Sequence, residues 1–226
     1  MKKLVLVIYA LSCLTNVMTA QSSIGVHIGP SFSKMRIEGD ADILKQSQNF
    51  TGVRAGLNYQ YKLNPAFNLE SGIYYNLTGF SIKQGTDFSI YGIDVPVSVT
   101  ATTQMHFIEI PLLMNVNFGN DYAKFYIHAG PQFSYAMDAD LRLRAKLLLD
   151  FNLGTYDINM RNNNFRQAEI SGLIGGGLKA KLSDKLDFNL GIDYMHGFTD
   201  LTDEPIVNVL TKRSVVNTAI GFTYKF

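Results

Sequence analysis

The strongest constraint in this sequence is a strict two-residue alternation over its last eleven positions. Every second side chain there is apolar or aromatic, apart from one threonine: Val216, Thr218, Ile220, Phe222, Tyr224 and Phe226. The residues between them are small or polar. This period places all the apolar side chains on one face of a β-strand. It predicts a strand with one face toward lipid and the other toward a polar interior.

Residues 1–20 have the features of a secretory signal peptide. Lys2 and Lys3 precede an apolar stretch over 4–14, and the small residue Ala20 predicts cleavage after it. The apolar stretch is too short to anchor the chain as a transmembrane helix. Cys13 leaves lipoprotein processing as an alternative, which we disfavour because only about ten residues separate it from Lys3. The expected organisation is a signal peptide, 1–20, and one β-barrel domain, 21–226.

The composition after position 20 excludes several classes of protein. It contains no cysteine, and the loss of Lys2 and Lys3 leaves 18 basic residues against 19 acidic ones. A chain so close to neutral, with no basic run, has no electrostatic footprint for nucleic acid. No later stretch contains the 18 or so apolar residues that a membrane helix needs. Membrane insertion would therefore require strands closed into a barrel, because lipid cannot satisfy an open strand edge.

Eight segments carry the alternation, and the connections between them differ regularly in length. The segments are 24–33, 53–62, 67–78, 108–118, 124–135, 167–182, 186–194 and 216–226, with tight turns at 64–66, 119–121 and 183–185 and long polar connections near 35–50, 80–104, 138–165 and 198–212. This predicts an all-β, eight-stranded antiparallel up-and-down transmembrane β-barrel in the bacterial outer membrane, with short periplasmic turns and long extracellular loops. Alternation continuing over 139–149 predicts an extracellular hairpin and leaves ten strands as an alternative.

Some residues predict irregular backbone within these segments. Pro30, Pro111 and Pro131 each remove a donor from the strand ladder, so each predicts a bulge or a strand end. The glycines at 175–177 predict a further bulge, which would shift the phase of their segment.

Charged residues occupy the predicted inward face. They are Arg54, Lys62, Glu70, Glu109, Glu169, Lys179, Asp187 and Asp193. Counted from the tight turns, Arg54, Glu109 and Asp193 lie at similar depth toward the outer end. Glu70 and Lys179 lie nearer the periplasm. An eight-stranded lumen is just wide enough for side chains to fill, so we expect clusters of opposite charge that form a hydrogen-bonded structural plug.

The residues do not match the patterns of known catalytic or metal sites. The four histidines lack metal-ligand spacing, and 175–177 lacks the Lys-Ser/Thr of a phosphate loop. Asp138 and Asp140 lie where a protease of the omptin type carries paired acids, but no Asp-x-His follows them. The His-x-Ser of a lipid A deacylase is also missing. We therefore expect no catalytic residue, cofactor or metal.

Three strings in the sequence are similar to one family of barrels. Residues 107–113, FIEIPLL, resemble the "LEIPLLL" strand of the PorT-type outer-membrane β-barrel proteins common in Bacteroidetes. Residues 129–133, AGPQF, resemble that family's next strand, and 193–200, DYMHGFTD, its "Y-x-x-G-L-x-D/N" strand end. The resemblance covers essentially the whole chain after the signal peptide. It implies a barrel; one member type is an accessory of type IX protein secretion, and most others have no assigned role.

These observations predict a non-enzymatic outer-membrane barrel that is a structural or accessory component of the cell envelope. A small-solute pore, or a membrane-embedded hydrolase, is the alternative. The expected partners are outer-membrane lipid, a protein of the envelope or secretion apparatus bound by the extracellular loops, and the barrel-assembly machinery. That machinery would read the C-terminal aromatics Phe222, Tyr224 and Phe226.

Overall fold

A computed structural model describes residues 22–38, 47–90, 93–120, 122–146, 150–157, 166–199 and 210–226. The regular structure of these residues is entirely β-strand: β1 (Ser22–Glu38), β2 (Ser47–Lys62), β3 (Phe67–Ile90), β4 (Ile93–Gly119), β5 (Ala123–Lys146), β6 (Asp150–Asp157), β7 (Ala168–Lys181), β8 (Leu186–Gly197) and β9 (Leu210–Lys225). No helix among them is long and apolar enough to cross a membrane. The predicted signal peptide lies outside the described residues.

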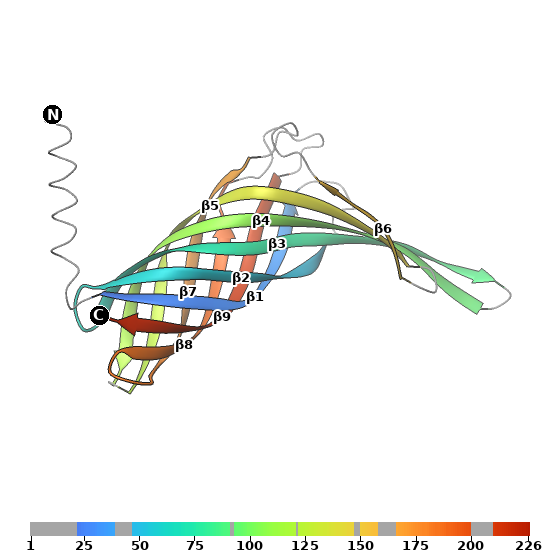
Figure 1. The fold of residues 1–226 in the computed structure, drawn as a ribbon. Coiled ribbons are helices and arrows are strands. Elements are labelled where there is room, and N and C mark those ends of the chain that lie inside the picture. The colour runs from blue at the N-terminus through green and yellow to red at the C-terminus, as the bar shows by residue number, and fades with distance from the viewer. Residues whose placement is uncertain are drawn as a thin grey trace, which may run out of the picture.

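Eight of the strands close into a barrel (Figure 1). The order around the sheet is β4-β3-β2-β1-β9-β8-β7-β5, and the pairing of β4 with β5 closes it. All the pairings are antiparallel. The predicted eight-stranded barrel is confirmed. The alternative of a ten-stranded barrel is wrong, because β6 pairs only with the outer part of β5, from Asp140 to Lys146. That pairing confirms the hairpin expected beyond residue 138.

Lipid imposes the two-residue alternation on the wall of the barrel. Large apolar side chains project outward from every barrel strand and are at least one-third exposed, among them Val26, Leu57, Ile73, Leu112, Ile127, Ile174, Ile192 and Phe222. The side chains between them point into the lumen and are mostly polar and buried. The wall therefore has the apolar exterior and polar interior of a transmembrane barrel.

Two of the tight turns share one construction. Asn64 Oδ1 accepts hydrogen bonds from the backbone N–H groups of Ala66 and Phe67, both at 2.9 Å. Asn120 Oδ1 accepts the equivalent pair from Tyr122 and Ala123, both at 3.0 Å. An Asn side chain that caps the next residues in this way stabilises a short reversal. Both turns lie at the periplasmic end.

At the other end, three strands continue well past the membrane. β3 and β4 have 24 and 27 residues, whereas about 9–11 are enough to cross a bilayer. They remain paired out to Ile90 and Ile93, and Figure 1 shows this hairpin running away from the barrel. The long loop predicted at 80–104 is therefore wrong. Outside lipid neither face of a strand must be apolar, so the backbone pairing continues after the hydropathy signal has ended.

The predicted bulges are also wrong. Each proline keeps a register partner on one neighbouring strand, without a shift at that point: Pro30 with Val53, Pro111 with Gln132, and Pro131 with Gly172. The register shifts lie elsewhere: between β2 and β3 at Asn49/Arg54, between β4 and β5 at His106/Phe107, and between β5 and β6 at Leu143/Arg144. A proline drops its pairing on one side only, and the ladder on its other side holds the strand in register.

The glycines at 175–177 also keep their register, and the two that face the lumen, Gly175 and Gly177, leave space for lumen side chains. A Cβ on Gly177 would lie 2.7 Å from Tyr126 Oη, and one on Gly175 would lie 2.5 Å from His128 Nε2. Both distances are too short for a carbon atom. A Cβ would come still closer to Asp193 Oδ1 at Gly175 and to the backbone oxygen of Leu190 at Gly177, so β5 and β8 together leave room for glycine alone.

Candidate functional site

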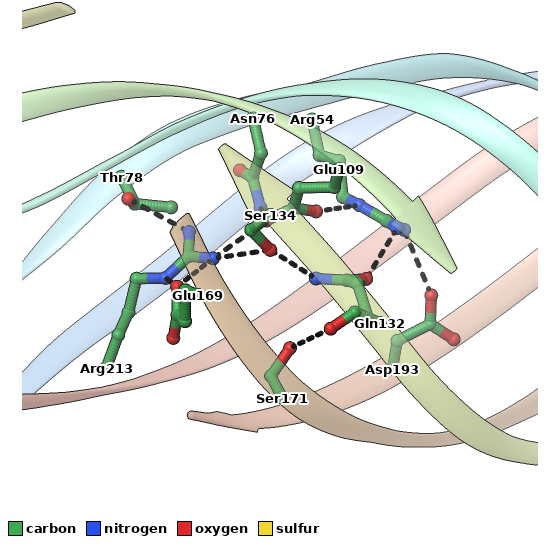
Figure 2. Close-up of polar contacts among 10 residues, drawn as sticks. All are labelled: Arg54, Asn76, Thr78, Glu109, Gln132, Ser134, Glu169, Ser171, Asp193 and Arg213. Atoms are coloured by element: carbon green, nitrogen blue, oxygen red, sulfur yellow. Dashed lines mark hydrogen bonds and ion pairs between the residues drawn. The ribbon is translucent and has the colours of Figure 1, made fainter. Parts of the chain in front are cut away.

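An ion cluster fills the outer part of the lumen (Figure 2). Arg54, on β2, donates from Nε to Glu109 Oε2 on β4 at 3.0 Å. Its Nη1 donates to Asp193 Oδ2 on β8 at 3.3 Å, and its Nη2 to Gln132 Oε1 on β5 at 3.5 Å. The ring of Tyr74 lies against the guanidinium, 3.9 Å from Cζ. One arginine thus connects three strands that are not its neighbours in the sheet.

A second arginine, Arg213 on β9, extends the cluster. It donates from Nε to Glu169 Oε2 at 3.0 Å and from Nη2 to Glu109 Oε1 at 3.2 Å. Its other donors reach Thr78 Oγ1 at 3.3 Å and Ser134 Oγ at 3.2 Å. Arg213 is only 2% exposed, so its charge is held almost entirely by protein groups.

Glu109 is shared by both arginines. Its two oxygens accept from Arg54 and Arg213, and Oε1 also accepts from Asn76 Nδ2 at 3.0 Å. It has no exposed surface. We call Arg54, Glu109, Glu169, Asp193 and Arg213 the outer ion network. A buried carboxylate is stable only when it is paired and hydrogen-bonded, and Glu109 meets both conditions.

His128, on β5, is hydrogen-bonded to this network. Its Nε2 lies 2.8 Å from Asp193 Oδ1, and its Nδ1 lies 3.2 Å from Asn115 Oδ1. Asn115 Nδ2 donates to Glu70 Oε2 at 3.0 Å, which fixes the orientation of the amide with its oxygen toward the imidazole. Both ring nitrogens therefore face acceptors, and the imidazole connects Asp193 on β8 with Asn115 on β4.

Apolar side chains close the lumen beyond the network. Met105 and Phe107, on β4, pack with Ala136 and Ala139, on β5, and all four are fully or almost fully buried. Arg213 Cζ lies 3.9 Å from the centre of the Phe107 ring. Water has no polar partner in such a cluster, and together with the ion network it closes the barrel toward the cell exterior.

A second polar group lies nearer the periplasm. Glu70 accepts hydrogen bonds from three amide groups, those of Asn58 at 2.8 Å and of Gln60 and Asn115 at 3.0 Å. Gln60 Oε1 in turn accepts from Lys179 Nζ at 2.9 Å. The opposite charges of Glu70 and Lys179 are thus bridged by one amide and do not form a direct ion pair.

The structure places the predicted inward residues as follows. Arg54, Glu109 and Asp193 come together in the outer ion network, while Glu70 and Lys179 lie in the lower group. Of the other inward charges, Glu169 joins Arg213, Asp187 pairs with Lys225 at 2.7 Å, and Lys62 lines the periplasmic mouth. Phe222, Tyr224 and Phe226 lie on the outward face, each about half exposed.

The sequence interpretation missed Arg213, because it began the last strand at residue 216. The alternation that puts Asn217 in the lumen, extended back by two and four residues, also puts Val215 and Arg213 there. The apolar Val215 concealed this, since an inward valine breaks the polar pattern. β9 in fact begins at Leu210, so its first residues lie in the segment that was predicted to be a loop.

The acids considered for protease chemistry lie outside the lumen. Asp138 caps the backbone N–H of Ala139 at 2.9 Å, and Asp140 lies 3.6 Å from His106 Nε2. His106 Nδ1 is 2.6 Å from Tyr75 Oη. No group of three or more potential metal ligands occurs in the part of the chain that the structure describes.

A closed eight-stranded antiparallel barrel, with an apolar exterior and a lumen filled by ion pairs, defines an integral outer-membrane β-barrel protein. The chain belongs to the family described as outer membrane protein beta-barrel domain, whose model matches residues 19–203. Its location is accordingly the bacterial outer membrane.

Solved structures of similar barrels include OprG from Pseudomonas aeruginosa, with 16% identity, 93% of this chain and 98% of that chain covered, and a TM-score of 0.45. Ail from Yersinia pestis has 13% identity, coverages of 90% and 99%, and a TM-score of 0.40. The outer membrane protease OmpT from Escherichia coli has 8% identity, coverages of 91% and 97%, and a TM-score of 0.40. No curated protein matches the sequence. The family assignment therefore rests on the match to the family model.

Replacing Arg213 by methionine tests how dry the outer ion network is. The change leaves Glu169 buried without its cation, so we expect a loss of about 3–5 kcal/mol in the free energy of unfolding, measured by urea titration in detergent micelles. Lys212→Met, one residue away on the opposite face of β9, is the matched control and should change it by less than about 0.5 kcal/mol. Arg213→Met combined with Glu169→Leu should cost less than the sum of the single changes. Equal stability of the Arg213 and Lys212 variants would show a wet lumen.

Proposed function

We propose that this protein is a non-enzymatic component of the cell envelope that holds a protein-binding β-sheet outside the outer membrane. The observation that carries this proposal is the continuation of β3, β4 and β5 beyond the barrel. About 14 residues of β3 remain after a membrane crossing, which corresponds to an extension on the order of 40 Å. β6 adds a fourth strand to this sheet by pairing with the outer part of β5.

The edges of the sheet supply a mode of binding. Among the described residues, β2 pairs with β3 only as far as Ile82, so 83–90 of β3 have β4 as their single neighbour. β6 likewise pairs on one side only. Free strand edges present unpaired N–H and C=O groups to another chain. An extended segment of a partner protein can add to such an edge by main-chain hydrogen bonds.

The filled lumen argues against the alternative of a small-solute pore. We expect wild-type protein in a planar lipid bilayer to show no steady large conductance, because the outer ion network and the apolar cluster beyond it leave no continuous water path. Steady open-channel currents from the pure protein would overturn this expectation and favour the pore.

Shortening the β3–β4 hairpin tests partner binding. Lys83 and Thr100 are register partners, so residues 84–99 can be replaced by Asn-Gly, a pair suited to a two-residue turn. A photo-crosslinker at position 156, where Tyr156 is 57% exposed on β6, should give a protein adduct in native outer membranes. The shortened variant should lose most of it.

The matched control for this experiment is the same crosslinker at position 174, where Ile174 is 55% exposed on the lipid face of β7. It should not give the adduct. If the adduct forms equally at position 174, the projecting sheet is not the binding surface. If it persists after the hairpin is shortened, the partner binds the edge of β6 and not that of β3.

The resemblance to PorT-type barrels supports a narrower form of the proposal, in which the partner belongs to the envelope or to a type IX secretion apparatus. Identification of the crosslinked protein by mass spectrometry tests it. An adduct with a protein unrelated to secretion would leave the binding role in place and remove the link to secretion.

We also propose that the assembly machinery for barrels reads the last strand. Phe226 is 56% exposed and contacts Tyr224 edge-on, with ring centres 5.5 Å apart, so its removal should cost the folded barrel no more than about 1.5–3 kcal/mol. We expect Phe226→Ala to lower the amount of protein in the outer membrane more than it lowers refolding in detergent. An equal decrease in outer-membrane protein and in refolding yield would exclude an assembly signal at Phe226.

A further inference from the structure

The periplasmic mouth of the lumen is an open cavity of about 300 Å³. We call it the vestibule. Its lining includes four lysines and two aspartates: Lys62, Lys124, Lys179, Lys225, Asp184 and Asp187. Neutral polar side chains, among them Ser23, Asn68 and Asn117, line it as well. Its side chains thus carry an excess of positive charge, and a cleft with walls of one sign concentrates ions of the opposite sign.

Both aspartates of the vestibule are already occupied by cations. Asp184 Oδ1 lies 2.7 Å from Lys181 Nζ, and Asp187 Oδ1 lies 2.7 Å from Lys225 Nζ. They are therefore already paired and do not serve as partners of Lys62 or Lys179. Among the described residues, neither Lys62 nor Lys179 has a carboxylate within 4.0 Å.

Lys179 forms the inner end of the vestibule. It is only 9% exposed, and its Nζ donates to the neutral acceptor Gln60 and lies 4.9 Å from the centre of the Tyr126 ring. Lys179 and Gln60 also line a much smaller chamber of about 30 Å³ above, which the outer ion network closes. The vestibule is thus a dead end, and a ligand can enter it only from the periplasmic side.

We propose that the vestibule binds an anion that carries a phosphate group. A nearly buried ammonium without a carboxylate partner is stabilised by a bound anion. The compact charge of lysine suits the many oxygen atoms of phosphate, and neither Lys62 nor Lys179 has a direct carboxylate contact that would compete with a phosphate oxygen. The volume lies at the lower limit of small-molecule pockets, so it suits a phosphate or a small phosphate ester.

Phosphate can reach this site from two sources, a soluble periplasmic compound or the headgroup of a phospholipid in the inner leaflet. Titration of the refolded, isotope-labelled barrel in zwitterionic micelles distinguishes them by NMR. One arm uses inorganic phosphate and the other uses short-chain phosphatidylglycerol, both at constant ionic strength set with chloride. We expect the amide signals of residues 60–62 and 179 to shift and saturate with one of the two.

Variants of the vestibule supply the critical comparison. Lys62→Gln and Lys179→Gln should each weaken binding about tenfold, the loss of one charge-assisted hydrogen bond. Lys185→Gln, an exposed lysine in a turn at the same end but outside the vestibule, should bind like wild type. Because Lys179 is nearly buried, Lys62→Gln at the open mouth keeps the test decisive if the Lys179 variant fails to fold.

Saturation with inorganic phosphate identifies a soluble ligand, and saturation with the lipid alone identifies a headgroup. Either result supports the site if it depends on Lys62. No saturable shift in either arm, or equal weakening by Lys62→Gln and Lys185→Gln, would overturn the proposal. The extracellular sheet takes no part in this experiment, so its result is independent of the function proposed above.

Discussion

The carboxylate of Glu109 is the interaction on which the barrel's interior depends. It has no exposed surface and binds Arg54 on β2 and Arg213 on β9 at the same time. Neither strand is a neighbour of β4 in the sheet, so these bonds cross the lumen and connect strands that the ladders do not join directly. A shift of one residue in any of these strands would turn its inward charge toward lipid. The outer ion network therefore fixes the register of the strands that contribute to it, β2, β4, β7, β8 and β9.

This plug also separates the two ends of the molecule. Beyond the network, Met105 and Phe107 form a dry apolar layer, and below it Lys179 and Gln60 divide the small chamber from the vestibule. Binding at one end therefore has no open path through which to affect the other. The extracellular sheet and the periplasmic mouth therefore lie on opposite sides of a closed plug.

The barrel itself could be predicted because lipid enforces the alternation wherever a strand crosses it. Where lipid ends, so does the signal: the paired strands within 80–104 looked like a loop, and Arg213 lay before the predicted start of its strand. The individual hydrogen bonds within the lumen could not be predicted from the alternation, for another reason. The stagger between the strands of a barrel decides which inward residues meet across the lumen. The alternation shows which residues face inward but does not give this stagger. Gly175 and Gly177 show the same limit, since the rings that lie against them come from β5.

An apolar plug would fill the lumen as well as ion pairs do, and it would avoid the cost of removing charges from water. It would, however, make both faces of each strand apolar. Segments of that kind have no preferred face, so their register is weakly specified, and apolar β-prone segments without charge are prone to aggregate. Polar and charged side chains on the lumen face keep the two faces of the strands distinct over most of the wall. Arginine suits this role because its five donors can satisfy several acceptors at once, as Arg213 does with Glu109, Glu169, Ser134 and Thr78.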